Sequence, residues 1–89
     1  MHTIHILVKG KVQGVFYRAT AKHVAMDLGL KGWVKNTEDG DVEMTVTGEQ
    51  KTIDDFVQWC HKGPERARVS EVVCSIVGTQ PFSKFSVLR

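Results

Sequence analysis

The order of strand-like and helix-like segments is the feature that most restricts the fold of this chain. Apolar residues alternate with polar ones where strands are expected, and recur at every third or fourth position where helices are expected. A short apolar run follows at the C-terminal end. The expected elements are, in order, a strand at 4–8, a helix at 18–28, strands at 32–37 and 42–47, a helix at 52–62, a strand at 69–77 and a short strand at 85–88.

This order predicts an α+β fold, the ferredoxin-like βαββαβ sandwich, in which two helices cover one face of an antiparallel or mixed sheet. Right-handed crossovers make the two strands of each βαβ unit parallel and give the strand order 4-1-3-2. The short C-terminal strand adds a fifth. A chain of 89 residues supports one two-layer core, so residues 1–89 are expected to form a single domain.

Three local signals predict where elements begin and end. Gly29 stands where a left-handed helix C-cap is expected. Thr52 followed by Asp55 resembles a capping box and predicts the start of the second helix. The dipeptide Asp39-Gly40 predicts a two-residue hairpin turn between the second and third strands.

Composition excludes several classes of protein. A formal charge of +2, dispersed along the chain, argues against a nucleic-acid partner. No charged segment precedes a long apolar run, which argues against a signal peptide and against a membrane span. Cys60 and Cys74 have no CxxC spacing and no neighbouring histidine pair, so both are expected to be free, mostly buried thiols. The free thiols favour a cytoplasmic protein, and we expect a monomer that binds neither nucleic acid nor a membrane.

The connection between the first strand and the first helix, Gly10–Arg18, is the first candidate site. A turn that leads from a strand into a helix presents backbone N–H groups and a helix N-terminus to an anion. Gly10 and Gly14 allow the chain to curl tightly, and the Arg18 guanidinium can grip phosphate oxygens with two parallel hydrogen bonds. The stretch matches neither GxxxxGK[ST] nor GxGxxG. A tight connection with a solvated arginine therefore remains the alternative.

Asn36 is the second candidate, near the end of the second strand. In the order 4-1-3-2 the first and second strands flank the third and run parallel, so their ends reach the same edge of the sheet. Asn36 can thus approach the Gly10–Arg18 connection. Its amide donates and accepts hydrogen bonds without titrating, which suits the positioning of a water molecule beside a bound phosphorus. The alternative is an asparagine that prepares a turn.

The remaining residues capable of chemistry show no catalytic or metal-binding spacing. The histidines form no HxH or HExxH pattern, and the serines stand in no elbow motif. Asp54 and Asp55 are better explained as first-turn helix charges than as a catalytic pair. No metal or cofactor is expected. The histidines and serines concerned are His2, His5, His23, His61, Ser70, Ser75, Ser83 and Ser86.

Two motifs in this order resemble the signatures of the acylphosphatases. The first, GxVQGVxFR, stands here as GKVQGVFYR at Gly10–Arg18, with Tyr17 in place of the usual phenylalanine. The second, GWVxN, stands as GWVKN at Gly32–Asn36. The resemblance continues through 40–43, 63–64, 67–69 and 85–89, and so covers essentially the whole chain.

This resemblance implies a metal-independent ferredoxin-like enzyme that hydrolyses the carboxyl–phosphate bond of acyl phosphates to a carboxylate and inorganic phosphate. It implies that Arg18 and Asn36 are catalytic, with Arg18 on the phosphoryl group and Asn36 on the attacking water. It also implies that the phosphate is held by loop residues, namely Gln13, Gly14, Val15, Phe16, Tyr17 and Arg18.

Two competing functions use the same fold, because fold alone does not determine function. The first is a non-catalytic module that binds acyl or carbamoyl phosphate. The second is an RNA-recognition domain, which needs aromatic and basic side chains on the open face of the central strands. The first strand offers only Thr3, His5 and Leu7 on that face, which argues against RNA.

Overall fold

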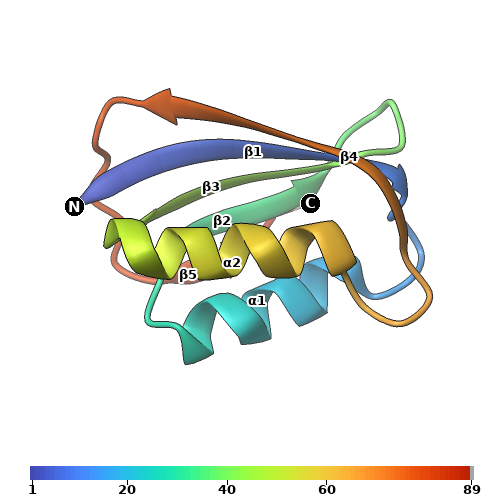
Figure 1. The fold of residues 1–89 in the computed structure, drawn as a ribbon, viewed down its shortest axis with the longest axis horizontal. Helices are drawn as coiled ribbons and strands as arrows, with labels where there is room; N and C mark the ends of the chain where they lie inside the picture. The colour runs from blue at the N-terminus through green and yellow to red at the C-terminus, as the bar shows by residue number, and fades with distance from the viewer. Residues whose placement is uncertain (89) are drawn as a thin grey trace.

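The structure, a computed structural model, describes residues 1–88. Both helices lie against one face of a five-stranded sheet, and the other face of the sheet is open (Figure 1). This is the expected ferredoxin-like sandwich. The elements are β1 (His2–Lys11), α1 (Tyr17–Asp27), β2 (Lys31–Asn36), β3 (Val42–Gly48), α2 (Gln50–Lys62), β4 (Arg68–Val77) and β5 (Phe85–Val87).

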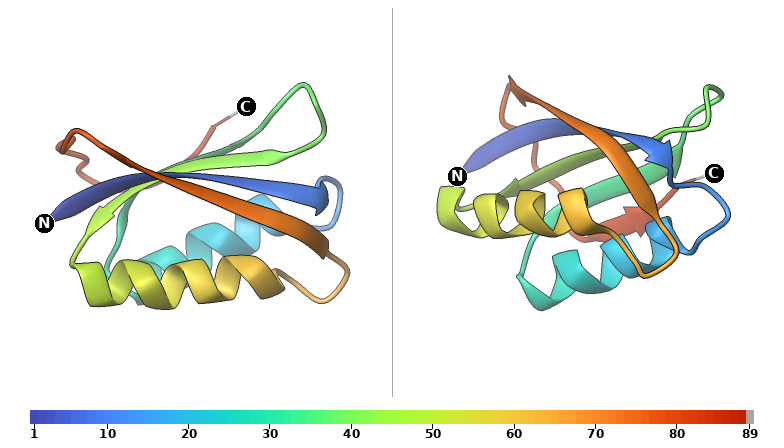
Figure 2. Two further views of the ribbon diagram at one scale, coloured as in Figure 1. Left: turned by 45° about the horizontal axis from the view of Figure 1, so that its top comes forward. Right: turned by 45° about the vertical axis from the view of Figure 1, so that its right-hand side comes forward.

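The strand order is β4-β1-β3-β2-β5, which confirms the predicted 4-1-3-2 and places the C-terminal strand at the edge beside β2. β1 pairs antiparallel with β3 and with β4, and β2 pairs antiparallel with β3. β5 runs parallel to β2. β1 and β2 are therefore parallel to each other on either side of β3. Their C-terminal ends meet at one end of the molecule, which Figure 2 shows from two further sides.

The core lies between the sheet and the helices, and it consists of the apolar stripes expected from the sequence. Alternate residues of β1 face the helices and are buried, as expected for a central strand. Tyr17, Ala21 and Ala25 are the buried residues of α1. Ile53, Phe56 and Cys60 are those of α2. Burial raises the pKa of the Cys60 thiol to about 12, so this thiol stays protonated at neutral pH.

The expectation of a two-residue hairpin at Asp39-Gly40 is wrong. The last ladder pair joins Asn36 to Val42, so residues 37–41 form the loop between β2 and β3. The Thr37 amide donates to the Asp41 carbonyl at 2.9 Å, and the Asp41 amide donates to the Thr37 hydroxyl at 3.1 Å. These bonds stabilise a wider loop than the dipeptide alone suggests.

The predicted start of α2 is also wrong. The helix begins at Gln50, and Glu49 is its N-cap without a side-chain hydrogen bond. Thr52 and Asp55 lie inside the helix, and its first turn contains no acidic residue. Gln50 and Lys51 have high helix propensity, which allows the helix to begin before the capping-box pattern. At the end of α1, by contrast, Gly29 adopts the expected left-handed conformation, with φ of 74°.

The cysteine expectation is half correct. Both thiols are free, but only Cys60 is buried, and Cys74 is exposed. Cys74 lies on β4 opposite Ile6 of β1. Because β4 is an edge strand, this part of it extends beyond the cover of the helices.

No helix within residues 1–88 is long and apolar enough to cross a bilayer.

The open face of the sheet carries a small polar network. His5 Nε2 lies 2.7 Å from Glu43 Oε2, and Lys35 Nζ lies 3.6 Å from the other carboxylate oxygen. The hydrogen bond from His5 and the charge of Lys35 hold the pKa of Glu43 below its usual range. Lys35 also lies 5.5 Å above the ring of Trp33. His5, Lys35 and Trp33 on this face are thus paired with each other or with Glu43.

Candidate active site

The loop from β1 to α1 is held in place by two buried valines. Val12 and Val15 are 1% and 6% exposed, so their side chains belong to the core. Between and after them, Gly14 and Phe16 take left-handed backbone conformations, with φ of 75° and 64°. The two buried anchors and the two left-handed residues curl the loop.

Gly10 has a different role from the flexible turn residue that the sequence suggested. It lies inside β1, at a shift in the register with β4. A Cβ atom built on Gly10 would meet the Arg68 carbonyl oxygen and the Ser70 backbone nitrogen. The glycine therefore permits close contact between β1 and β4 at the base of the loop.

Gln13 ties the loop to the β2–β3 hairpin. Its side-chain Nε2 donates to the Thr37 carbonyl and to the Asp41 carbonyl, each at 2.8 Å. Both donor positions of the amide are thus used within the protein. The Gln13 side chain positions the loop beside the end of β2, and only its backbone remains for an anion. The sequence offered no signal for this link, because the partners lie 24 and 28 residues away.

The loop, the first turn of α1 and the end of β2 surround one cavity of about 720 Å³. The structure therefore brings Arg18 and Asn36 together, as the strand order predicted. Gly14, Phe16 and Tyr17 also reach this cavity, whereas Gln13 and Val15 line a neighbouring one. The lining residues are Val12, Gly14, Phe16, Tyr17, Arg18, Ala19, Asn36 and Val87.

Arg18 is the second residue of α1, and its guanidinium reaches toward the end of the chain. Its Nη1 donates to the Leu88 carbonyl at 3.3 Å. β5 holds Leu88 there, because the Leu88 amide donates to the Val34 carbonyl of β2 at 2.8 Å. The C-terminal strand thus helps to position the guanidinium. The sequence predicted the strand but not this contact.

Asn36 is the last residue of β2. Its Oδ1 is buried and has no hydrogen-bond partner among residues 1–88. A buried acceptor without a partner costs free energy, on the order of 1–3 kcal/mol. Asn36 itself is one of the residues that line the cavity, so the end of β2 brings an amide side chain with an unpaired acceptor to this region.

The start of α1 adds backbone donors to the same cavity. Phe16 is the N-cap, and within residues 1–88 no capping side-chain hydrogen bond is found there. The first turn carries no acidic residue. The free N–H groups and the helix dipole therefore favour an anion at this end, beside Arg18.

Tyr17 anchors the first turn of α1 rather than contacting a ligand with its hydroxyl. Its side chain is 1% exposed, and its hydroxyl donates to the Cys60 carbonyl of α2 at 2.8 Å. Burial raises the pKa of this phenol, so it stays neutral. The centroid of the Tyr17 ring lies 5.2 Å from the centroid of the Trp59 ring. A Cβ on Gly63 would lie 2.8 Å from the Tyr17 ring, which explains a glycine at the end of α2.

A second cavity, of about 680 Å³, lies on the other side of Gly14. It carries three cationic side chains, Lys11, Arg66 and Arg68, together with Glu65. Residues 1–88 contain no group of three or more His, Cys, Asp or Glu side chains placed to hold a metal ion. Arg18 in the first cavity and the three cations of the second place positive charge on both sides of the loop.

Comparison with known proteins identifies the family. The acylphosphatase family model matches residues 4–87. An acylphosphatase from Methylococcus capsulatus is 46% identical over 90 residues, which covers 100% of this chain and 98% of the relative. The chain belongs to the acylphosphatase family.

Solved structures of this family agree with the fold. A Coxiella burnetii acylphosphatase superposes with a TM-score of 0.95 at 41% identity, covering 98% of this chain and 92% of that one. A Bacillus subtilis acylphosphatase superposes with a TM-score of 0.97 at 30% identity, covering 100% of both chains. Membership of the acylphosphatase family, expected from the motifs at Gly10–Arg18 and Gly32–Asn36, is therefore confirmed.

Proposed function

We propose that this member of the acylphosphatase family hydrolyses the carboxyl–phosphate bond of acyl phosphates, with Arg18 and Asn36 as its catalytic residues. The observation that carries the proposal is the shared cavity. Arg18, at a helix N-terminus, lines the same hollow as Asn36, whose buried amide oxygen has no partner among residues 1–88. The first suits a phosphoryl group, and the second suits a water molecule.

In the proposed mechanism, the amides of the loop and of the first turn of α1 bind the phosphoryl oxygens, and the Arg18 guanidinium adds a fixed positive charge. Water donates one hydrogen bond to Asn36 Oδ1, which directs its lone pair at phosphorus. The new P–O bond forms as the bond to the acyl oxygen breaks, and the carboxylate leaves. The water's proton passes to a phosphoryl oxygen of the substrate.

This scheme depends on positioning and on charge stabilisation. A carboxylate is a good leaving group, so no protein base is required. Each preorganised donor to the developing charge contributes about 2.7–4 kcal/mol, by analogy with oxyanion-hole donors. We propose that these donors replace a metal ion. We also propose that the chain acts as a cytoplasmic monomer, since one chain supplies every residue of the site and both cysteines are free.

The experiment mixes the purified chain with benzoyl phosphate and follows the loss of the substrate's ultraviolet absorbance, with and without exhaustive chelation by EDTA. We expect turnover that is unchanged by EDTA. Binding without turnover would instead indicate a module that holds acyl phosphates without cleaving them. Loss of activity on chelation, restored by added magnesium or zinc, would contradict the metal-independent mechanism alone.

A further inference from the structure

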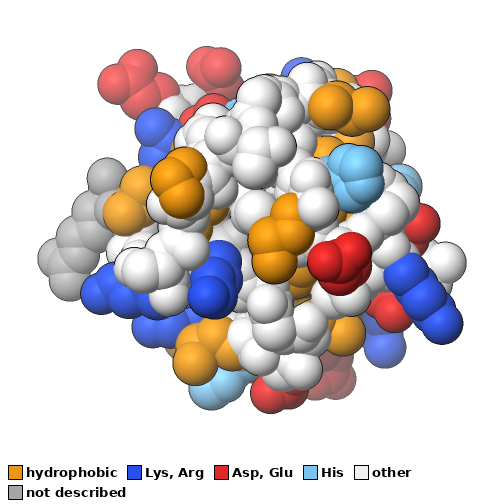
Figure 3. Space-filling model, turned by 90° about the vertical axis from the view of Figure 1, so that its left-hand side faces the viewer, with side chains coloured by type: hydrophobic (Ala, Val, Ile, Leu, Met, Phe, Trp, Pro, Cys, Tyr) orange, Lys and Arg blue, Asp and Glu red, His pale blue; other side chains and the backbone are white. Residues whose placement is uncertain are grey.

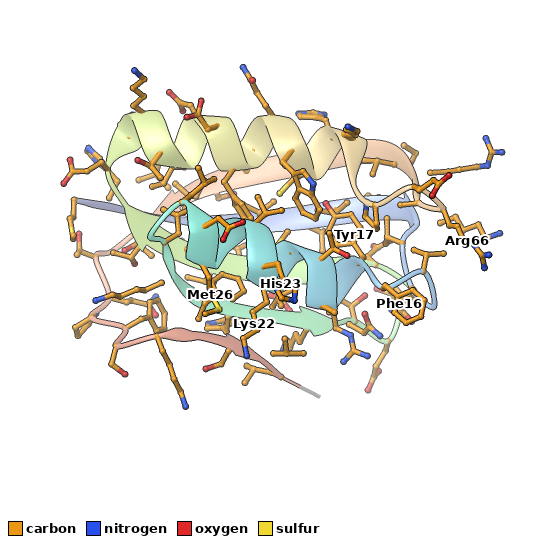
Figure 4. All side chains as sticks on the ribbon, turned by 90° about the horizontal axis from the view of Figure 1, so that it is seen from below. Phe16, Tyr17, Lys22, His23, Met26 and Arg66 are labelled. Carbon is orange, nitrogen blue, oxygen red and sulfur yellow. The ribbon has the colours of Figure 1, made fainter. Side chains whose placement is uncertain are left out.

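Phe16 has an aromatic side chain that the proposed mechanism does not use. Its side chain is 77% exposed, whereas the next residue, Tyr17, is 1% exposed. Figure 4 shows Phe16 at the outer rim of the molecule, while Tyr17 lies between the two helices. The described aromatic ring pairs join Tyr17 to Trp59, and Phe56 to Trp59 and Phe85, so none involves Phe16.

The backbone fixes this exposed position. Phe16 is the one non-glycine residue in the described part of the chain with a positive φ, 64°. A residue with a Cβ resists this conformation, and an exposed ring gains nothing from burial. The buried side chains on either side, Val15 and Tyr17, hold the loop so that Phe16 must point outward. Strain of this kind is concentrated at binding sites.

Apart from Val87, the other exposed large apolar side chains of the described residues lie outside the cavity that holds Arg18 and Asn36. At the end of the molecule opposite the loop, hydrophobic side chains are scattered among polar and charged ones (Figure 3). Phe16, by contrast, lines the same cavity as Arg18 and Asn36. Val87 of β5, 38% exposed, lines it too. The cavity thus combines polar groups for a phosphoryl group with two exposed apolar side chains.

We propose that Phe16, together with Val87, forms the subsite for the acyl part of the substrate and makes this chain prefer acyl phosphates with a flat, apolar acyl group. This inference rests on the proposed function. The phosphoryl group of an acyl phosphate occupies the Arg18–Asn36 side, and the carbonyl directs the acyl group outward. An aromatic acyl group can then stack against the Phe16 ring, whereas an acetyl group is too small to cover it.

The test compares benzoyl phosphate with acetyl phosphate. Phe16→Asn removes the ring and keeps a residue that accepts the left-handed conformation. We expect the ratio of kcat/KM for benzoyl over acetyl phosphate to fall about 2- to 10-fold, mainly through KM, as for loss of an aromatic pair. Phe16→Trp should preserve or raise the ratio. The inhibition constant of inorganic phosphate, which has no acyl group, should change little in either variant.

Met26→Asn is the matched control. Met26 is also an exposed apolar residue, 58% exposed, but it lies toward the other end of α1 and outside the cavity lining (Figure 4). The ratio should be unchanged in this variant.

An unchanged ratio in Phe16→Asn would overturn the acyl subsite while leaving the proposed function intact. An equal loss for both substrates, with weaker phosphate inhibition, would show that Phe16 only shapes the loop, and would also overturn the subsite. Failure of the unaltered chain to cleave either substrate would overturn the proposed function, and the subsite with it.

Discussion

α1 and α2 both begin without a hydrogen bond from a capping side chain, and neither has an acidic residue in its first turn. Each carries a cation at its second position, Arg18 in α1 and Lys51 in α2. Yet residues 49–53 at the start of α2 line neither cavity beside the β1–α1 loop. The two helix starts therefore share these features, although α2 has an acidic N-cap residue, Glu49, where α1 has Phe16, and their surroundings differ.

The two helix N-termini differ in the segments and side chains that surround them. α1 follows a loop with left-handed residues at Gly14 and Phe16, and it faces Asn36 from another strand. α2 follows β3 through the single residue Glu49, in an extended conformation. In the proposed function, the anion site at α1 therefore combines a helix N-terminus and a cation with a curled loop and a second polar group.

The largest expected effect comes from removing that second polar group. Asn36→Ala should lower kcat about 10²- to 10³-fold, the loss measured when one preorganised hydrogen-bonding group is deleted. The inhibition constant of inorganic phosphate should stay nearly unchanged, because Asn36 contacts mainly the water. Arg18→Lys should instead both raise the inhibition constant of inorganic phosphate and lower kcat, because lysine keeps the charge but lacks the planar guanidinium group. Steady-state kinetics at fixed pH provide both numbers. Near-normal turnover in Asn36→Ala would leave Asn36 only a turn residue.

The next effect concerns stability. Inorganic phosphate at 100 times its dissociation constant should stabilise the folded chain by about 2.7 kcal/mol, because it binds only the native state. Arg18→Ala should remove most of this protection. Lys51→Ala, the matching change at the second position of α2, should keep it. Urea denaturation with and without phosphate measures the difference. Equal loss of protection in both variants would show that the site is not confined to α1.

A pair of glycines at either end of α1 provides the third comparison. Gly14 and Gly29 have almost identical φ, 75° and 74°, and a Cβ on either would meet open space. Gly14→Ala and Gly29→Ala should each destabilise the fold by about 1 kcal/mol. Only Gly14→Ala should also lower kcat/KM, by about 10-fold, because it displaces backbone donors. Thermal unfolding and benzoyl phosphate kinetics test the pair. Equal activity in both variants would mean that the Gly14 amides do not bind phosphate.

The smallest expected effect comes from an added charge at the third position of each helix. Ala19→Glu places a carboxylate in the cavity, so KM and the phosphate inhibition constant should rise about 2- to 5-fold. Thr52→Glu places the same charge at the start of α2. It should stabilise that helix by about 0.3–1 kcal/mol and leave the kinetics unchanged. Slower turnover in Thr52→Glu would contradict the view that only the start of α1 takes part in binding.

Patterns along the chain predicted most of the fold. The apolar stripes of β1, α1 and α2 define which faces are buried, and the strand order follows from connection handedness. The same order brought Asn36 to the loop. Boundaries were less predictable, because the start of α2 depended on the helix propensity of Gln50 and Lys51 rather than on the capping pattern at Thr52.

Contacts between distant residues could not be predicted. The sequence does not show that the Gln13 amide is used by the hairpin, or that the Leu88 carbonyl holds Arg18. Nor does it show which of two adjacent aromatic residues is buried. Phe16 and Tyr17 have opposite exposures because the left-handed turn at Phe16 reverses the direction of one side chain. Such choices depend on backbone conformation and tertiary contacts, which a pattern of residue types does not specify.

The two hydrogen bonds of the Gln13 side chain have a consequence for the speed of binding. They join the loop to the hairpin through contacts within the protein, so the loop conformation does not depend on a ligand. Binding to a preformed site requires no slow rearrangement before or after the encounter. The observed association rate of an oxyanion should therefore rise linearly with its concentration, in a single phase and without a plateau.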